Sequence, residues 1–446
     1  MHFTTAGESH GSFLVTVVTD VPAGVSVTTG IINAFLARRR SGYGRSERMT
    51  FERDEIQILS GVQGDKSTGA PLAVLIANVD SSYATGDGSP PDDRHTGDSV
   101  AGDPPSNNAH SNNCCVDDFP SHNDQPSGAH FNDRHIISPT KDDCIPRPGH
   151  ADMAALQKIG ATDLRAISER ASGRETAARV VAGAIAASYL AEFGVEVSSF
   201  VTGIGSVDMP AERVAAGVLA KPPFTRVDIE ASPVRCPDAD TTSRIVAAID
   251  AAAHDGDTLG GRFMLVVRGL VPGLGSYTCG PERLSSLLAA TLASIPTVKG
   301  LEFGRGFDGS YHRGSQINDV IALVPEDGCI QPGRLSNNLG GLEGGMTNGQ
   351  PLVVRVATKA PPGLARPLAS VDLMRRQTTP APTRRSDVCV VPAVAVVAEA
   401  EAAVVLASAC QKKFGGDTVA DAQAACEHYR ERLAALSTCS LNASGG

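Results

Sequence analysis

Two long segments rich in alanine and valine constrain the fold of this 446-residue chain more than any other feature. The first, RETAARVVAGAIAASYLAEFG at 174–194, predicts a helix with apolar residues around nearly its whole circumference, which must be covered on most sides. The second is the longest apolar run, Val388 to Ala398, which continues through Glu399 and Glu401 to Ala409. It predicts another buried helix, because the carboxylates of Glu399 and Glu401 make a membrane span costly. Helices buried in this way need sheets packed outside them, which predicts a layered α+β body.

Strand-like segments rich in valine and isoleucine alternate with helical segments along the rest of the chain. The expected strands cover residues 14–18, 56–62, 71–76, 195–204, 263–270 and 352–357. The expected helices cover residues 174–193, 241–254, 281–294, 392–412 and 416–436. This order of elements is typical of a mixed fold with a sizeable core.

The composition narrows the choice of function. The formal net charge of -10 argues against binding to nucleic acid or to an anionic membrane, since both need a positive field. Tryptophan is absent and aromatic residues make up 4%, so the core must consist of small aliphatic side chains. The ten cysteines lack the paired spacing of a zinc site, and the first motif leaves no room for a leader. We therefore expect reduced thiols and a cytoplasmic location.

Residues 82–144 differ from the rest of the chain, because Asp, Asn, Ser, Pro, Gly and His dominate them. Such a composition cannot bury enough apolar surface to offset the entropy of ordering, so we expect a disordered insertion. The segment contains five of the eleven histidines and the adjacent pair Cys114 and Cys115. Their spacing is irregular and no rigid element holds them, so we expect a solvated loop without a metal.

The motif TTAGESHGSFL, at residues 4–14, places Glu8, Ser9 and His10 between two glycines just before an apolar run. By itself it is consistent with an ordinary tight turn, since Gly and Ser are common turn residues. The same residues are also a carboxylate, a hydroxyl and an imidazole, which together can move protons. The motif alone leaves both interpretations open.

Four clusters of arginine occur elsewhere on this acidic chain. They are RPGHADMAALQKIG with Arg147 and His150, ERASGRET with Arg170, Ser172 and Arg174, ARRRSGYGRSERM with Arg38, Arg39, Arg40 and Arg45, and TRRSDVCVVP with Arg384, Arg385 and Asp387. Each cluster could be a set of solvated or locally paired side chains, worth about 0 to 1 kcal/mol per pair. Taken together with the two histidines, they predict a pocket for a multiply anionic ligand and proton transfer.

Two glycine-rich stretches, residues 259–276 and 337–351, allow backbone amides to approach a phosphate-bearing cofactor. Neither has the spacing of a dinucleotide-binding fingerprint or of a P-loop, so those assignments fail.

At this point the sequence resembles the chorismate synthase family. The matching stretches keep the family's order and span nearly the whole chain except the insertion: TAGESHG, RRRSGYGRSERM, SGVQGDKSTGAPLAVLIAN, RPGHAD, ERASGRETAARVVAGAIA, DTLGGRF, VKGLEFGRGF, GSQINDVI, NNLGGLEGGMTNGQP and RRSDVCVVPA. The resemblance implies a lyase that removes phosphate from 5-enolpyruvylshikimate 3-phosphate by anti 1,4-elimination to give chorismate. It also implies reduced FMN as cofactor, although the reaction has no net redox change.

The resemblance implies catalytic roles for five residues. His10 would donate a proton to the departing phosphate, and His150 would protonate the reduced flavin near N1. Asp387, with Ser9 and Ser172, would form a relay that removes the substrate proton through the flavin.

The resemblance also implies binding residues. The substrate anions would be bound by Arg39, Arg45, Arg147 and Arg174. The FMN positions would be Arg170, Ala171, Ser172, Pro296, Thr297, Gly344, Lys359, Ala360, Pro361, Pro362, Gly363 and Arg385. Ala171, Gly173, Pro296, Thr297 and Gly363 depart from the residues usual in the family, which puts side-chain contacts to the flavin at these positions in doubt.

The family fold is a single domain over the whole chain, with long core helices between two antiparallel sheets, assembled as a homotetramer. We expect this β-α-β sandwich, with no catalytic residue in the insertion at 82–144. NADPH is a candidate source of electrons for the flavin. A flavin reductase that uses NAD(P)H, and a binding protein that has lost its catalytic function, remain as alternatives.

Overall fold

The two apolar segments form the two longest central helices of a three-layered fold, α5 (Thr176–Ala191) and α12 (Val391–Phe414). The computed structural model describes residues 1–46, 54–78, 144–160, 164–326, 329–383 and 387–438. All of them belong to one unit, made of residues 1–81 and 139–446. The expected disorder of residues 82–144 concerns a segment of which only Cys144 lies within the described residues.

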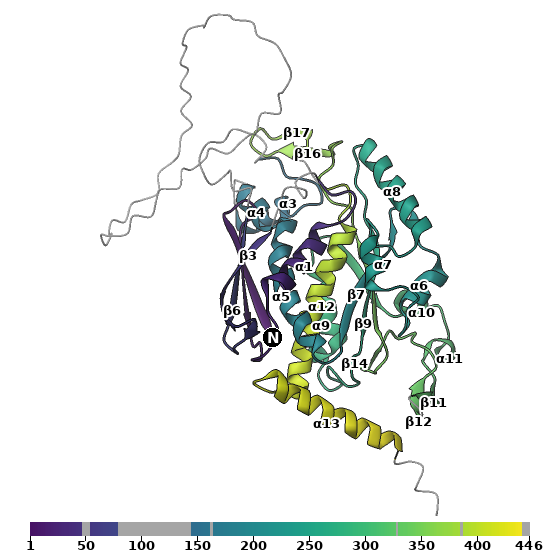
Figure 1. Ribbon diagram of the computed structural model, residues 1–446. Helices are drawn as coiled ribbons and strands as arrows, with labels where there is room; N and C mark the ends of the chain where they lie inside the picture. The colour runs from purple at the N-terminus through teal and green to yellow at the C-terminus, as the bar shows by residue number, and fades with distance from the viewer. Residues whose placement is uncertain (47–53, 79–143, 161–163, 327–328, 384–386, 439–446) are drawn as a thin grey trace, which may run out of the picture. The chain divides into compact units, whose positions relative to one another are not determined.

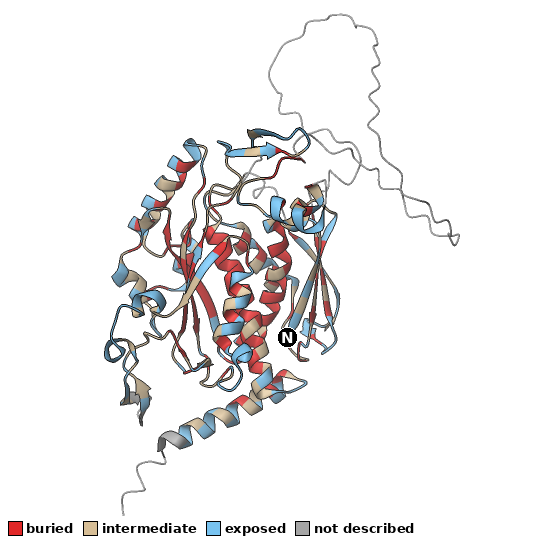
Figure 2. Ribbon diagram, turned by 180° about the vertical axis from the view of Figure 1, so that it is seen from behind, coloured by how far each residue is buried: buried red, intermediate tan, exposed pale blue. Residues whose placement is uncertain are grey.

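Small residues allow α5 and α12 to pack very closely. A Cβ added to Gly183 of α5 would lie 2.2 Å from Cβ and 2.3 Å from Cα of Ala400 on α12. Buried residues therefore concentrate in this middle layer, as Figure 2 shows in red. Helix α12 is long and apolar enough to cross a membrane, but 83% of its apolar window is buried inside the fold. It is the core helix that the sequence predicts.

The helix α1 (Thr29–Arg40) shows that α5 and α12 begin at the same end of the layer. Arg39, in its last turn, donates a hydrogen bond from Nε to Oγ1 of Thr176, the first residue of α5, at 2.9 Å. A Cβ on Gly42, two residues beyond α1, would lie 3.1 Å from Cβ of Pro392 in the first turn of α12. The N-termini of both long helices therefore meet at the C-terminal end of α1.

One outer layer is an antiparallel sheet of β1 (His2–Gly7), β2 (Phe13–Thr19), β6 (Leu72–Ala77) and β3 (Glu55–Ser60), in that order. Residues on β2 and β6 alternate between buried and partly buried, as expected for a sheet with one face on the helices. On that face the Thr16 hydroxyl donates to the carbonyl of Ala178 on α5 at 2.7 Å.

The other outer layer is an antiparallel sheet with the order β10 (Val298–Phe303), β15 (Leu352–Thr358), β9 (Gly261–Arg268), β7 (Glu196–Ile204) and β8 (Val207–Asp208). Strand β7 is buried along nearly its whole length, because α12 covers one face and the helices α6, α7 and α8 lie outside the other (Figure 1). The expected sandwich of helices between two antiparallel sheets is confirmed.

The remaining elements connect or flank these layers. They are β4 (Val62–Gln63), β5 (Lys66–Ser67), α3 (Asp152–Ile159), α4 (Arg165–Arg170), η3 (Gly173–Glu175), α6 (Ala211–Gly217), α7 (Arg226–Ala231), α8 (Ala239–His254), η4 (Gly280–Glu282), α9 (Leu284–Ala293), α10 (Gly306–Gly309), α11 (Gly314–Ile317), β11 (Ile321–Glu326), β12 (Cys329–Arg334), β13 (Leu342–Glu343), β14 (Met346–Thr347), β16 (Ala369–Asp372), β17 (Gln377–Pro380) and α13 (Val419–Thr438).

Every strand and helix expected from the sequence overlaps an observed element, but several observed elements were missed, among them β1 and α1 near the N-terminus and the sheet strand β10. Strand β1 is an edge strand with an exposed and partly buried pattern, so it lacks a strong apolar signal. Helix α1 buries only Ile32, Leu36 and Arg39, and its last turn consists of three arginines. The buried face of α1 is narrow and ends in arginines, so the hydrophobic periodicity of this segment did not predict a helix.

A buried ionic cluster joins α1, α12 and the segment before α8. Glu399 of α12 is 1% exposed and contacts Arg38 at 2.6 Å and Arg235 at 2.9 Å. The Ser199 hydroxyl of β7 also donates to Glu399 at 2.6 Å. Burial opposes ionisation of Glu399, but the two guanidinium groups outweigh it and keep its pKa below the usual range.

The packing at Gly183 leads to a stability prediction. Gly183→Ala would force its new methyl group onto the backbone of Ala400, so the two helices would have to separate. Overpacking of this kind costs about 1 to 3 kcal/mol, which urea unfolding would detect.

Gly30→Ala is the matched control, since only the Thr28 hydroxyl lies near its added Cβ, at 3.7 Å. Alanine is a better helix former than glycine, so this variant should be as stable as the wild type or slightly more stable. A Gly183→Ala protein with wild-type stability would contradict the described packing.

Candidate active site

The motif between Gly7 and Phe13 forms the connection from β1 to β2, and it contacts the segment that leads into α5. The Ser9 hydroxyl donates to Oγ of Ser172 at 3.0 Å. The backbone N–H of Ser9 also donates to the carbonyl of Glu169 on α4, at 3.2 Å. Ser9 and Ser172, which the sequence predicts to act together, are therefore neighbours although they are far apart in the chain.

His10 is held by a residue that sequence reasoning did not select. Glu169 accepts a hydrogen bond from the His10 backbone N–H at 2.7 Å, and its other oxygen lies 2.8 Å from Nδ1 of the His10 ring. The His10 side chain is 32% exposed and that of Glu169 is 15% exposed. Burial favours the neutral acid at Glu169, but the hydrogen bonds from His10 outweigh it and lower the pKa of Glu169.

The predicted anion-binding residue Arg174 lies below the surface. It is 6% exposed, donates to Oδ1 of Asn78 at 3.0 and 2.8 Å, and pairs with Asp54. The Asn78 amide in turn donates to the carbonyls of Glu8, Ser9 and Gly11. Asn78 therefore links Arg174 to the loop that carries His10.

Arg39 and Arg45 connect Asp387 to the same region. Arg45 Nε lies 3.1 Å from the carboxylate of Asp387, which also accepts from the backbone of Ser46 at 2.7 Å. Arg45 donates to the carbonyl of Arg39 at 3.3 Å, and Arg39, which is 5% exposed, donates to the carbonyl of Gly173 at 2.8 Å. Asp387 thus reaches the segment after Ser172 through two arginines, while its own contacts are with Arg45 and Ser46.

The RPGHAD motif forms a second cluster before α3. Asp152 lies 2.5 Å from Nδ1 of His150 and contacts Arg147 at 2.8 and 3.0 Å. Arg147 also donates to the Ser168 hydroxyl of α4 at 2.7 Å. The side chain of Asp152 is only 2% exposed. Burial raises its pKa, but the hydrogen bonds from His150 and Arg147 outweigh this and hold the pKa of Asp152 well below its usual range.

Two of the predicted FMN-binding positions, Lys359 and Pro362, lie against the RPGHAD corner, and two more, Thr297 and Pro361, lie beside them. Lys359 donates from Nζ to the carbonyl of Gly149 at 2.5 Å and from its backbone to the carbonyl of Thr297 at 2.9 Å. The Pro361 carbonyl accepts from the Thr258 hydroxyl at 2.8 Å. A Cβ on Gly149 would lie 3.7 Å from Cβ of Pro362. Burial, then repulsion by Lys299, lowers the pKa of Lys359.

Apart from Gly344, the remaining predicted FMN positions lie as follows. Arg170 and Ala171 lie at the end of α4, where Arg170 donates to the hydroxyl of Thr5 on β1 at 2.8 Å. Ala360 and Gly363 belong to the same loop as Lys359, and Pro296 directly precedes Thr297. Arg385 lies outside the described residues.

Gly344 is separated from the other positions within this chain. It occupies the turn between β13 and β14, which precedes the Leu352 end of β15, whereas Lys359 follows the Thr358 end. A strand of seven residues spans about 23 Å, so the two positions lie at opposite ends of the sheet. In Figure 1, β14 is near the bottom of the view and α3 and α4 are near the top.

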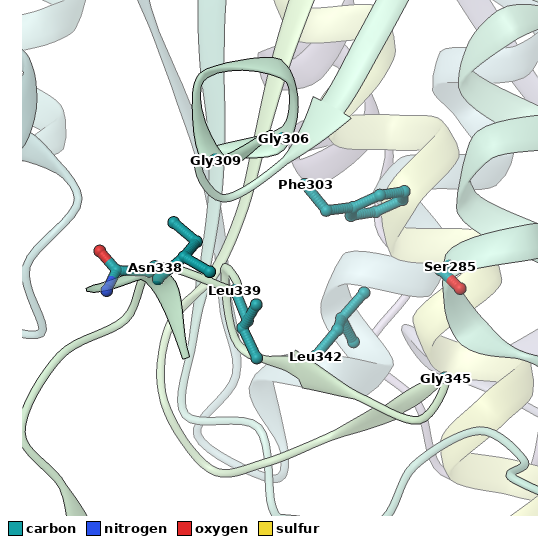
Figure 3. A pocket seen from close by; sticks show the side chains of 9 residues that line it. Ser285, Phe303, Gly306, Gly309, Asn338, Leu339, Leu342 and Gly345 are labelled. Carbon is teal, nitrogen blue, oxygen red and sulfur yellow. The ribbon is translucent and has the colours of Figure 1, made fainter. Parts of the chain in front are cut away.

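A cavity of about 350 Å³ lies at the Gly344 end. Phe303, Leu339 and Leu342 line it with Ser285 and Asn338, as Figure 3 shows, and Gly345 is at its edge. No titratable side chain occurs among the described residues that line this cavity. His10, the RPGHAD corner and Asp387 lie at the other end of the sandwich, near α4 and the N-termini of α5 and α12.

Comparisons with known proteins show the family to which the chain belongs. The family model for chorismate synthase matches residues 1–410. A protein named chorismate synthase from Symbiobacterium thermophilum is 43% identical over 97% of this chain and 100% of its own length. One from Desulforudis audaxviator is 42% identical over 98% of each. A solved structure, titled as a crystal structure of chorismate synthase, has a TM-score of 0.70 and 31% identity, and the match covers 97% of this chain and 98% of that one.

The lowered pKa of Asp152 leads to a prediction about acid stability. Asp152→Asn removes the charge that Arg147 and His150 bind, so the variant should be less stable than the wild type at neutral pH. An unfolded Asp titrates near about 3.9, above the folded value, so this contribution exists above that pH and disappears as the pH falls further. The difference in melting temperature between the wild type and Asp152→Asn should therefore become smaller below about pH 4.

Asp240→Asn is the control, because Asp240 forms an exposed pair with Arg244 at 3.0 Å. Such a pair contributes little, so this variant should follow the wild type at every pH. An Asp152→Asn difference in melting temperature that keeps its size as the pH falls to about 2 would contradict the described role of the ionised carboxylate.

Proposed function

The chain belongs to the chorismate synthase family, and we propose from this premise that it eliminates phosphate from 5-enolpyruvylshikimate 3-phosphate to give chorismate. The enzyme is then a carbon–oxygen lyase. In the reaction a ring C–H bond and the C–O bond to phosphate break, and a new C=C bond forms. The phosphate leaves with the electron pair of its C–O bond. The observation that carries this proposal is the gathering of His10, His150, Asp387 and the arginines at one end of the sandwich.

The charges at this end suit the substrate, which has two carboxylates and a phosphate. Arg39, Arg45, Arg147 and Arg174 supply guanidinium groups, which match planar anions well. The N-termini of α5 and α12 also meet here and add positive potential from their helix dipoles. Because Arg39 and Arg174 are nearly buried, we infer that they act mainly through the local potential and by fixing Ser172, while the partly exposed groups contact the substrate directly.

The residues around Thr297 fit a flavin cofactor. Thr297 adopts a φ of +76°, which is unusual for a β-branched residue and is typical of functional sites. Its hydroxyl is buried without a hydrogen-bond partner, so a polar group of a bound molecule would satisfy it. Lys359 and Arg170 add positive charge for the FMN phosphate. Reduced FMN, when bound, supplies the electron-rich ring that the elimination requires without net oxidation.

The chain's own groups then divide the proton transfers. His10, the more exposed of the two histidines, protonates the departing phosphate. His150, on the corner that contacts Lys359, provides a proton at the cofactor side of the site. Ser9, Ser172 and Asp387 handle the proton that the substrate loses. Imidazoles suit these tasks because their ordinary pKa lies near neutrality.

Three finer properties belong to the same proposal. NADPH is the candidate electron source, and bleaching of bound FMN by NADPH alone under anaerobic conditions would support it. We also propose a homotetramer in the cytoplasm. Within the described residues, Cys236, Cys279, Cys389, Cys410 and Cys426 are free thiols, which agrees with a reducing compartment.

The proposed roles predict the effect of removing each imidazole. His10→Ala and His150→Ala should each lower the rate of anaerobic phosphate release, with dithionite-reduced FMN supplied, by about 10² to 10⁴-fold. Folding should be retained, since His10 is partly exposed and His150 lies on a loop.

His428→Ala provides the control, because His428 is 83% exposed on α13 and should have no effect on turnover. Near-normal rates in both site variants would refute the assignment of roles. A wild-type protein that releases no phosphate would refute the proposed function itself.

A further inference from the structure

Two carboxylates without an assigned role contact the rings of the two predicted catalytic histidines in the same way. Glu169 lies 2.8 Å from Nδ1 of His10, and Asp152 lies 2.5 Å from Nδ1 of His150. Nε2 is the nitrogen farther from the carboxylate in both rings, and at His150 Nη2 of Arg147 lies 3.0 Å from Nδ1 and 3.4 Å from Nε2. The similarity is independent of sequence, because Glu169 is 159 positions from its histidine and Asp152 is two positions from its own.

Both carboxylates are ionised near neutral pH, since hydrogen bonds lower the pKa of each. An ionised carboxylate only accepts hydrogen bonds, so the nitrogen that faces it must carry the proton. At His150, Nη2 of Arg147 also lies 3.0 Å from Nδ1, but its two hydrogens have partners in the Ser168 hydroxyl, at 2.7 Å, and in Asp152, at 3.0 Å. Nδ1 is therefore the protonated nitrogen in both neutral rings. This leaves Nε2 as the position that gains or loses a proton during turnover.

Each carboxylate is itself held firmly. Glu169 uses its second oxygen to accept the His10 backbone N–H at 2.7 Å, which fixes the ring relative to its own main chain. Asp152 accepts from Arg147 through Nε, Nη2 and the backbone N–H. A carboxylate with so many donors has little freedom to rotate, so it also fixes the orientation of the imidazole.

The short helix α4 contacts both carboxylate–histidine pairs. Ser168 accepts from Nη2 of Arg147 at 2.7 Å, while the next residue, Glu169, holds His10. Successive residues on a helix point about 100° apart, so one helix can support both pairs on different sides. The separation of the two histidines is thus set by a single rigid element.

We propose that Glu169 and Asp152 are positioning residues that keep the proton on Nδ1 of His10 and His150 and present Nε2 of each ring to the ligands. The catalytic use of Nε2 rests on the proposed function, but the protonation pattern does not. An amide in place of such a carboxylate can donate to Nδ1 and thereby favours the opposite tautomer, with loss of turnover of up to about 10⁴-fold.

The tautomers can be measured in the ligand-free protein. Protein with ¹⁵N-labelled histidine is examined by long-range ¹H–¹⁵N NMR at a pH high enough to leave both rings neutral, and the signals are assigned with His10→Ala and His150→Ala. The wild type should show a protonated Nδ1 and an unprotonated Nε2 at both rings. Glu169→Gln should reverse this pattern at His10 alone, and Asp152→Asn should reverse it at His150 alone.

Glu431→Gln is the matched control, because Glu431 lies 3.8 Å from His428 in an exposed carboxylate–imidazole pair on α13. It should change neither site histidine. In the phosphate-release assay, Glu169→Gln should lower kcat by about 10² to 10⁴-fold with little change in KM, since the groups that bind the substrate are retained. Asp152→Asn should lower kcat similarly and also raise KM, because Asp152 holds Arg147.

A wild-type spectrum with the proton on Nε2 of both rings would overturn the proposal, and this result does not depend on whether any variant folds. Wild-type rates in folded Glu169→Gln and Asp152→Asn would also overturn it. If the wild-type tautomers are as expected but the protein releases no phosphate, the proposed function fails and the assignment of the protonation pattern stands.

Discussion

The close packing of α5 against α12 is the constraint on which the rest of the structure depends. Gly183 and Ala400 bring the two backbones so near that no larger residue fits between them. Because the helices start at the same end, this contact fixes the positions of the segments that precede them, residues 169–175 and 387–390. Both outer sheets pack on this pair, so the loops at the β1–β2 turn and after β15 are placed by the same layer. The arrangement of the site follows from the packing of the core.

Charge in the site is balanced by internal contacts before any ligand binds. Arg174 pairs with Asp54, Arg45 with Asp387 and Arg147 with Asp152. Guanidinium groups that are already fixed lose little freedom when an anion arrives, which favours preorganised binding of a trianion. The positive groups are concentrated where three distant segments meet.

The sequence predicted the core better than it predicted the support of the site. All-round apolarity identified α5 and α12, and valine-rich runs identified most strands, because burial on both sides leaves a strong compositional signal. The clustered chemistry of Ser9, His10 and His150 was visible in short motifs. Glu169 was also visible within ERASGRET, but its contact with His10 depends on tertiary structure and has no sequence periodicity. Gly344 lies in a motif that matches the family, but the motif did not reveal that Gly344 is far from the other predicted FMN positions.

Hydrogen–deuterium exchange in the presence of oxidised FMN and substrate tests most directly whether a single site exists at the α5 and α12 N-termini, because this mixture binds without turnover. The account predicts slower exchange in peptides covering residues 5–12, 147–152 and 359–363, and unchanged exchange around residues 338–347. Slower exchange confined to residues 338–347, at the apolar cavity, would contradict it.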